Sequence, residues 1–166
     1  MFVGMDTTSK SIPLNQGKFA LVDEGDFEWL NQWKWHFHYG YAERSVNLGR
    51  DITGKQHTKT IKMHQLIMCA PKGMEVDHKD GNKLDNRRSN LRICTHAENT
   101  QNRKVNYNKK FKGVNWHKRM GMWQVSIRVN KNLKHLGYFN DEIIAAKKYN
   151  ELARSSFGEY ARLNDV

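Results

Sequence analysis

Residues 75–99 limit the fold of this chain more than any other stretch, because two four-residue strand-like runs flank a long polar loop there. The runs are Glu75–His78 and Leu91–Cys94, and Asp80-Gly81-Asn82 after the first run predicts a turn, since Gly and Asn tolerate left-handed backbone. Thr95 and Glu98 have the spacing of a capping box, which predicts that a helix begins here. The order strand, loop, strand, helix predicts a small α+β unit.

The mean hydropathy of −0.84 argues against one large core in a chain of 166 residues and favours several small modules. We therefore predict an α+β fold in four segments. These are a β-rich N-terminal module (1–60), the strand–loop–strand–helix core (61–104), a basic linker (105–110) and a C-terminal three-stranded antiparallel sheet plus helix (111–166).

The N-terminal module combines short strands with an unusual density of aromatic residues. Lys18–Val22 is predicted to be a strand, and Asp26 is predicted to cap a short helix that runs through Trp33. From Trp33 to Tyr41, aromatic residues alternate with polar ones, the period of a half-buried strand. The aromatic side chains form either a small core or a base-stacking surface. Further on, the sequence predicts a turn at 49–54, a strand at 58–63 and a helix at 64–70 stopped by Pro71.

The C-terminal module contains the cleanest strand pattern in the chain. Trp123, Val125, Ile127 and Val129 share one face of a predicted strand, and Gln124, Ser126 and Arg128 share the other. Flanking strands are predicted at 112–117 and 134–139, and Asn140 is predicted to cap a helix at 141–156 that Gly158 closes. The apolar stripe of this helix should cover one face of the sheet and leave the polar face open.

The net charge of +11 lies entirely in residues 61–166, because residues 1–60 hold seven basic and seven acidic side chains. This asymmetry indicates a polyanionic partner for the C-terminal two thirds. A basic solvated surface is the plain alternative, and an anionic membrane is a weaker one because no long basic amphipathic helix occurs. The linker region 101–110 adds four basic residues, including Arg103 and Lys104, which either lie along a DNA groove or serve as a spacer.

Cysteine usage and hydropathy indicate the compartment. Cys69 and Cys94 form no CxxC pair, which excludes a zinc ribbon with four cysteine ligands. Each lies beside apolar residues, so we predict two buried free thiols and a reducing, cytoplasmic location. The sequence has no signal-peptide pattern and no apolar run of about 18 residues, so we expect neither standard secretion nor a membrane span.

The central segment carries the residue types of a one-metal phosphodiester-cleaving site. His78 is suited to act as general base because its unperturbed pKa lies near neutrality. Asp77 offers a hard oxygen ligand for Mg²⁺ or Mn²⁺, Asn99 can add an amide oxygen, and Asn90 can hold the loop against the His78 strand. Strand neighbours point to opposite faces, so a twist or bulge must let Asp77 and His78 reach one phosphate. An EF-hand is disfavoured because the carboxylate spacing and the Glu at position twelve are missing.

The stretch from His64 to Arg103 closely resembles the HNH endonuclease family, in the branch of phage and intron homing endonucleases. The resemblance is carried by MHQLIM, VDHKDGN, SNLR and HAENTQNR. It implies two antiparallel strands and a helix around one divalent metal (ββα-metal), with His78 as general base, Asp77 and Asn99 as ligands and Asn90 organising the loop. His96, on the same predicted helix, competes for the ligand role of Asn99. His64 is expected to be a packing or supporting residue, with a catalytic role as the alternative.

Residues 111–164 resemble the plant ethylene-response-factor DNA-binding domain, a three-stranded sheet backed by one helix. The resemblance is carried by FKGV, Trp123, IR, LGYF, AA, Tyr149 and ARLN. It implies that the sheet lies in the DNA major groove and contacts it through five positions: Lys112, Asn115, Ser126, Arg128 and His135. Several arginines and tryptophans of that family are replaced here, so its target specificity does not transfer.

These features predict a metal-dependent homing endonuclease that hydrolyses double-stranded DNA, has no small-molecule substrate and acts in a bacterial or phage-infected cell. One site per chain predicts nicking by a monomer, whereas a double-strand cut would need a dimer or sequential turnover. The first alternative is a non-catalytic, sequence-specific DNA-binding protein on a degenerate HNH scaffold. The second is an RNA-directed nuclease, against which the duplex-reading module argues.

Overall fold

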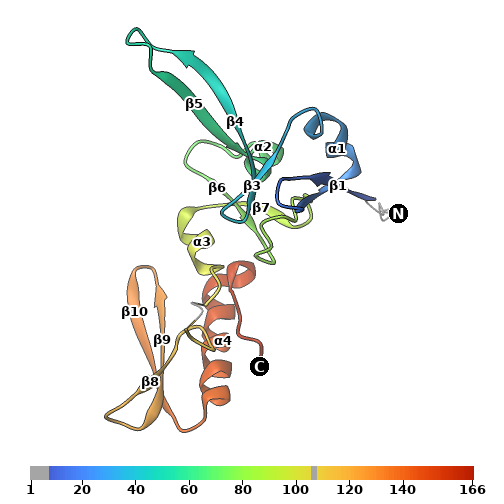
Figure 1. Ribbon diagram of the computed structural model, residues 1–166. Coiled ribbons are helices and arrows are strands. Elements are labelled where there is room, and N and C mark those ends of the chain that lie inside the picture. Colours follow the sequence, from blue (N-terminus) through green and yellow to red (C-terminus); the bar gives the residue numbers. More distant parts are fainter. Residues whose placement is uncertain (1–7, 106–107) are drawn as a thin grey trace. The chain divides into compact units, whose positions relative to one another are not determined.

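A computed structural model describes residues 8–105 and 108–166, and the chain divides into two compact units, Met1–His96 and Ala97–Val166 (Figure 1). The first unit contains β1 (Ser9–Pro13), β2 (Phe19–Asp23), α1 (Glu24–Leu30), β3 (His36–His38), β4 (Tyr41–Arg50), β5 (Gln56–Lys62), α2 (Met63–Met68), β6 (Glu75–His78) and β7 (Leu91–Cys94). Helix α3 (His96–Gln101) begins at His96, the last residue of the first unit. The second unit continues with β8 (Val114–His117), β9 (Met122–Val129), β10 (Asn132–Phe139), α4 (Glu142–Phe157) and the 3-10 turn η1 (Gly158–Tyr160).

Three small antiparallel sheets make up the first unit, with strand orders β1-β2, β3-β4-β5 and β6-β7. The long hairpin of β4 and β5 extends away from the other sheets of this unit (Figure 1). Together with the helices of both units, these sheets confirm the predicted α+β class with small modules. The division between the two units falls after His96, and the finer boundaries at 60, 104 and 110 stay predictions.

One hydrophobic core serves the whole first unit. Its members come from both sides of residue 60: Ile12, Ala20, Val22, Leu30, Trp35, Ala42, Met63, Ile67, Val76 and Leu91. Trp35 is almost fully buried, and its indole N–H donates to the Leu30 carbonyl at 2.8 Å. Trp33 packs edge-on against both Trp29 and Trp35. The tryptophans of this module therefore form a core.

Three local predictions for the first unit are wrong. The alternating stretch 33–41 is a hairpin, because Tyr39 and Gly40 adopt φ of +46° and +88° and turn β3 back onto β4. Asp26 lies inside α1, where it is buried and bound to Arg88, and the residue before the helix is Asp23. Helix α2 ends at Met68, before the predicted residue 70, because Cys69 adopts a left-handed conformation as its C-cap; the Cys69 thiol is exposed, whereas Cys94 is buried as predicted.

Backbone hydrogen bonds connect β2 to the polar loop between β6 and β7. Leu21 donates to the Leu84 carbonyl at 2.8 Å and accepts from the Asn86 amide at 2.7 Å. Arg88 adds a side-chain link, since its guanidinium donates to both carboxylate oxygens of Asp26 at 2.8 and 2.9 Å. The loop is thus fixed by residues more than sixty positions earlier in the chain.

The second unit is a three-stranded sheet, ordered β10-β9-β8, with α4 packed along one face (Figure 1). Most of the predicted inward positions belong to its core, which consists of Phe111, Val114, Val125, Ile127, Ala145, Ala146, Tyr149 and Ala153. The other predicted positions, Trp123, Val129 and Leu152, are partly buried and pack against this core. The helix cap is Asp141, one residue later than predicted, and its carboxylate accepts from the Ile144 amide at 2.8 Å. Gly158 closes the helix with φ of +52°, as predicted.

In the described residues, 8–105 and 108–166, none of the helices combines the length and the apolar character that crossing a membrane requires.

Candidate active site

Strand β6 places the predicted general base, His78, and the predicted metal ligand Asp77 in the interior of the first unit. Strands β6 and β7 pair antiparallel over four residues without a bulge, with Asp77 opposite Arg92 and His78 opposite Leu91. The pairing of these strands therefore supplies no bulge, and the convergence of Asp77 and His78 on one phosphate stays a prediction. Asp77 and His78 are both buried, although neighbours on a strand point to opposite faces.

The imidazole of His78 is held in one orientation. Its Nε2 lies 3.4 Å from the amide oxygen of Asn86, and the amide nitrogen of Asn86 donates to the Leu84 carbonyl at 3.1 Å. Because that bond fixes which end of the amide faces the imidazole, His78 Nε2 is the protonated nitrogen and Nδ1 carries the lone pair. Burial lowers the pKa of His78, so the ring is neutral at pH 7.

Asp77 forms a buried ion pair with Arg92. The Nε and Nη2 atoms of Arg92 lie 3.0 and 2.8 Å from the same carboxylate oxygen, Oδ2, and the two residues are 8% and 7% exposed. A buried carboxylate is stable only when a cation or hydrogen bonds compensate its lost hydration. Arg92 supplies part of this compensation and restricts the orientation of Asp77.

Asn90 connects the two ends of the loop between β6 and β7. Its side chain accepts from the Asp80 amide at 3.2 Å and donates to the Asp80 carboxylate and to the Asp85 carbonyl, both at 2.9 Å. Its own carbonyl accepts from the Lys79 amide at 2.9 Å, which extends the β6–β7 ladder. These contacts hold the residues that follow His78, while the catalytic role of Asn90 stays a prediction.

A second histidine and a tyrosine pack against His78. The ring of His64 lies 4.8 Å from that of His78 between centroids, and the ring of Tyr41 lies 5.1 Å from His64 and 6.2 Å from His78. Burial, reinforced by the charges of nearby side chains, lowers the pKa of His64 to about 3. The sequence analysis assigned neither Tyr41 nor Asn86 to this site, because Tyr41 is only the last residue of the aromatic run that begins at Trp33, and an Asn in a polar loop carries no signal of its own.

The predicted metal ligands belong to different units of the chain. Asp77 lies on β6, and Asn99 lies on α3 in the second unit, so their pairing stays a prediction. The competitor His96 is exposed and contacts Glu75 through Nδ1 at 2.8 Å. Within residues 8–105 and 108–166, no group of three His, Cys, Asp or Glu side chains is arranged to hold a metal. A carboxylate and an amide oxygen nevertheless fit Mg²⁺, which keeps several waters and takes few protein ligands.

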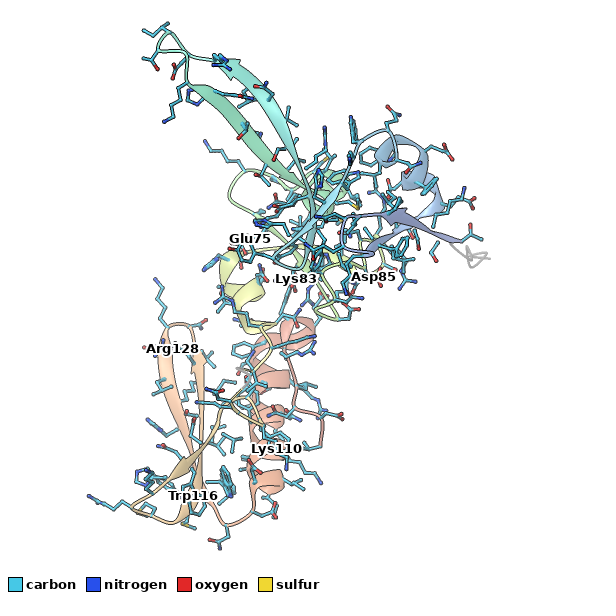
Figure 2. The ribbon with its side chains drawn as sticks, viewed as in Figure 1. Glu75, Lys83, Asp85, Lys110, Trp116 and Arg128 are labelled. Atoms are coloured by element: carbon cyan, nitrogen blue, oxygen red, sulfur yellow. The ribbon has the colours of Figure 1, made fainter. Side chains whose placement is uncertain are left out.

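The predicted DNA contacts of the second unit lie mainly on the sheet face opposite α4. Ser126 pairs across the strands with His135, whose Nδ1 contacts the Gln124 amide at 3.1 Å. Arg128 is exposed towards one end of β9 (Figure 2). Asn115 accepts a hydrogen bond from the Lys109 ammonium. This face is accessible, and beside its polar residues it carries the exposed side chains of Leu133, opposite Arg128, and Tyr138, opposite Gln124.

Lys112 and the basic residues after α3 form a separate group. The Lys112 ammonium donates to the carbonyls of Gln101 and Arg103, the second at 2.9 Å, and burial lowers its pKa to about 8. This ammonium already has two acceptors, and its contact with DNA stays a prediction. Arg103 and Lys104 are exposed directly after the helix, whereas residues 106 and 107 of the predicted linker lie outside the described residues.

Comparison with known proteins gives a family match within the central segment that contains His78. Residues 70–101 match the profile of the HNH endonuclease family. The chain is 29% identical over 157 residues to "Uncharacterized HNH endonuclease L560" of Acanthamoeba polyphaga mimivirus, covering 91% of this chain and 77% of that protein. It is 37% identical over 80 residues to "Protein 3.8" of Escherichia phage T7, covering 44% of this chain and 66% of that protein. No solved structure gives a significant match.

These comparisons support an HNH nuclease segment in the chain and do not add support for the resemblance of residues 111–164 to ethylene-response factors.

Proposed function

We propose that this chain is a metal-dependent DNA endonuclease of homing type that hydrolyses phosphodiester bonds in double-stranded DNA. The observation that carries the proposal is the state of His78: the imidazole is buried, neutral and held by Asn86 through Nε2. A general base needs an unprotonated nitrogen at its working pH, and Nδ1 meets this requirement. The match of residues 70–101 to HNH endonucleases supports the same reaction class.

In the proposed reaction, Nδ1 of His78 takes a proton from the water that attacks the phosphorus atom. Asn86 accepts the Nε2–H throughout and preserves the tautomer. The proton converts His78 to an imidazolium, and the negative charges of Asp77, Asp80 and Asp85 act to raise its pKa, which stabilises the cation once it forms. Burial disfavours that cation in the resting protein, so the base is poised to accept and then release a proton.

Asp77 and Asn99 are the residues that we assign to the divalent metal. Bound there, Mg²⁺ or Mn²⁺ would supply positive charge for the leaving 3′-oxygen. Arg92 restricts the orientation of the Asp77 carboxylate, and Asn90 keeps the loop after His78 closed. Oxygen donors of this type favour hard cations over zinc.

We assign DNA recognition to the second unit. Ser126, Arg128 and His135 would face the duplex from the open side of the sheet, with Arg103 and Lys104 contacting phosphates. With one catalytic site per chain, we expect single-strand nicks from a monomer. The similarity to a phage protein supports action inside a phage-infected or bacterial cell.

The test is incubation of supercoiled plasmids carrying host-genome fragments with Mg²⁺ or Mn²⁺. We compare wild type with His78→Ala, and use His36→Ala, an exposed histidine on β3, as the matched control. Metal-dependent nicking by wild type and His36→Ala, absent from His78→Ala, is the expected result.

Two outcomes would contradict the proposal. A protein that shifts DNA in a gel but never cleaves it would be a non-catalytic DNA-binding protein. Cleavage of RNA in preference to duplex DNA would identify an RNA-directed nuclease.

A further inference from the structure

Two lysines meet on the ring of Tyr41, next to the histidine pair. The Lys62 ammonium lies 4.4 Å from the centre of the ring and the Lys83 ammonium 4.2 Å, so the two nitrogens are separated by no more than the sum of these distances. Lys62 ends β5, Lys83 lies in the loop after β6 (Figure 2), and Tyr41 begins β4. The chain brings them together from three segments, and we call Tyr41, Lys62, His64 and Lys83 the Tyr41 cluster.

The charges of the Tyr41 cluster are not balanced by nearby acids. In the described part of the chain, neither Lys62 nor Lys83 has a carboxylate within 4 Å. Glu43 lies opposite Lys62 in the β4–β5 register, but its carboxylate contacts His38 at 2.6 Å. Two ammonium groups this close repel each other, and an aromatic face offsets only part of that cost.

Lys83 is held in place by the turn before Tyr41. Its side chain crosses Gly40, where an added Cβ would lie 3.1 Å from Lys83 Cδ, and its ammonium reaches the Tyr39 carbonyl at 3.4 Å. Gly40 has φ of +88°, so this turn both needs glycine and leaves room for the lysine stem. The position of the Lys83 charge is therefore set by packing.

His64 adds a buried polar group that lacks a partner. It is 4% exposed, and its Nδ1 has no hydrogen-bond partner in the described structure. A buried polar atom without a partner costs free energy and calls for an explanation, such as a ligand that is absent from the protein alone. The imidazole packs against both Tyr41 and His78, so such a ligand would lie beside the proposed general base.

We propose that Lys62 and Lys83, whose ammonium groups lie over the Tyr41 ring, bind a phosphate of the DNA backbone. This phosphate would neighbour the one that is attacked by the water that His78 activates. Lysine ammonium groups bind phosphate as point charges, and two of them can contact different oxygens of one phosphate. This contact would position the cleaved strand relative to the general base His78. It would be made by residues of the first unit alone, independently of the second unit. The inference rests on the proposed function for the identity of the ligand as DNA.

The experiment measures DNA affinity against salt in the full-length protein. All variants are made in the His78→Ala background, which prevents cleavage. Lys62→Gln/Lys83→Gln is added to this parent, and both proteins are titrated with the DNA fragment that wild type nicks. If wild type nicks no fragment, a mixed-sequence duplex is used instead. The control is Lys18→Gln/Lys34→Gln, which removes the same charge from two exposed lysines of the same unit.

Loss of one phosphate contact should reduce the slope of log K against log[salt] by about 1 in magnitude. We expect this change and roughly tenfold weaker binding at moderate salt in the cluster variant, and little change of slope in the control. Lys62→Arg/Lys83→Arg should bind as the parent does, which separates lost charge from lost folding. An unchanged slope in a folded Gln variant would overturn the inference, even if wild type nicks DNA.

A second measurement separates DNA from free phosphate. Inorganic phosphate is titrated into the parent and the cluster variant by calorimetry. Phosphate binding that the variant loses, together with an unchanged DNA slope, would assign the cluster to a small anion and refute the DNA contact. If the cluster variant shows the expected change of slope but wild type never nicks DNA, the proposed function is refuted and the phosphate contact still stands.

Discussion

Replacing His64 with Gln should remove an acid sensitivity from the first unit. Burial holds the pKa of His64 at about 3 in the folded protein, compared with 6.5 for an unperturbed histidine. Below pH 6.5 His64 becomes protonated in the unfolded chain, whereas in the folded protein it becomes protonated only near pH 3. The unfolded state therefore binds more protons in this window, and the free energy of unfolding falls as the pH is lowered.

The size of the effect follows from the two pKa values. At pH 5 the unfolded histidine is almost fully protonated and the folded one is not, which favours unfolding by about 2 kcal/mol relative to pH 7.5. The 4% exposure of His64 leaves little solvent screening to reduce this figure. The variant lacks the titrating group, so its free energy of unfolding should fall about 2 kcal/mol less than that of wild type over the same interval.

The assay is urea unfolding at pH 7.5 and pH 5, followed by tryptophan fluorescence, with wild type, His64→Gln and the exposed control His36→Gln. The quantity compared is the change in unfolding free energy between the two pH values, so any constant cost of the substitution cancels. His36→Gln should follow wild type. Parallel pH dependence of wild type and His64→Gln would refute the reasoning, because a solvated His64 titrates alike in both states.

Three further substitutions test the packing around the site and in the second unit. Arg92→Met leaves the Asp77 carboxylate buried without its ion-pair partner and should lower the unfolding free energy of the first unit by roughly 3–5 kcal/mol in urea titrations. Gly113→Ala should cost about 3 kcal/mol or more by thermal unfolding, because its Cβ would lie 2.1 Å from the Tyr149 ring at a φ of +76°. Asp141→Ala removes the cap of α4 and should cost about 1 kcal/mol in circular dichroism melts.

Each of these has a matched control. Arg50→Met, on the exposed hairpin, should change stability little, and an equal loss in both arginine variants would contradict the importance of the buried pair. Gly121→Ala shares the positive φ but has open space at Cβ, so an equal cost there would assign the Gly113 effect to backbone strain alone. Asp141→Asn keeps a capping oxygen and should behave as wild type.

Local patterns predicted the elements whose neighbours lie close in sequence. The runs of β6 and β7 and the alternating positions of β9 need only a period of two and a nearby turn, and the structure has all three strands. The hairpin of β3 and β4 was missed because the aromatic alternation continues through Tyr39-Gly40, and only backbone φ distinguishes a turn there from an extended strand.

The predicted chemistry required pairs of residues that no local pattern connects. Asp26 has the sequence context of a helix cap, but its function is to hold Arg88, 62 positions later. Asn86 lies in a loop rich in polar residues, and only its contact with His78 distinguishes it from a turn residue. The Tyr41 cluster combines three segments. Charge counting assigned the whole excess of +11 to residues 61–166, and it could not distinguish Lys62 and Lys83 from the other basic residues there.

The backbone ladder between Leu21 and the loop at Leu84 and Asn86 has a consequence for synthesis of the protein. A chain leaving the ribosome makes β2 long before the loop that completes it, and this pairing spans a large loop-closure distance. The edge of β2 that does not face β1 must therefore stay unpaired at Leu21 until the residues that follow His78 emerge. The hydrogen bonds of Leu21 and the contact that holds His78 to Asn86 would then form in one late event, so the surroundings of His78 would stay incomplete while the chain is being translated.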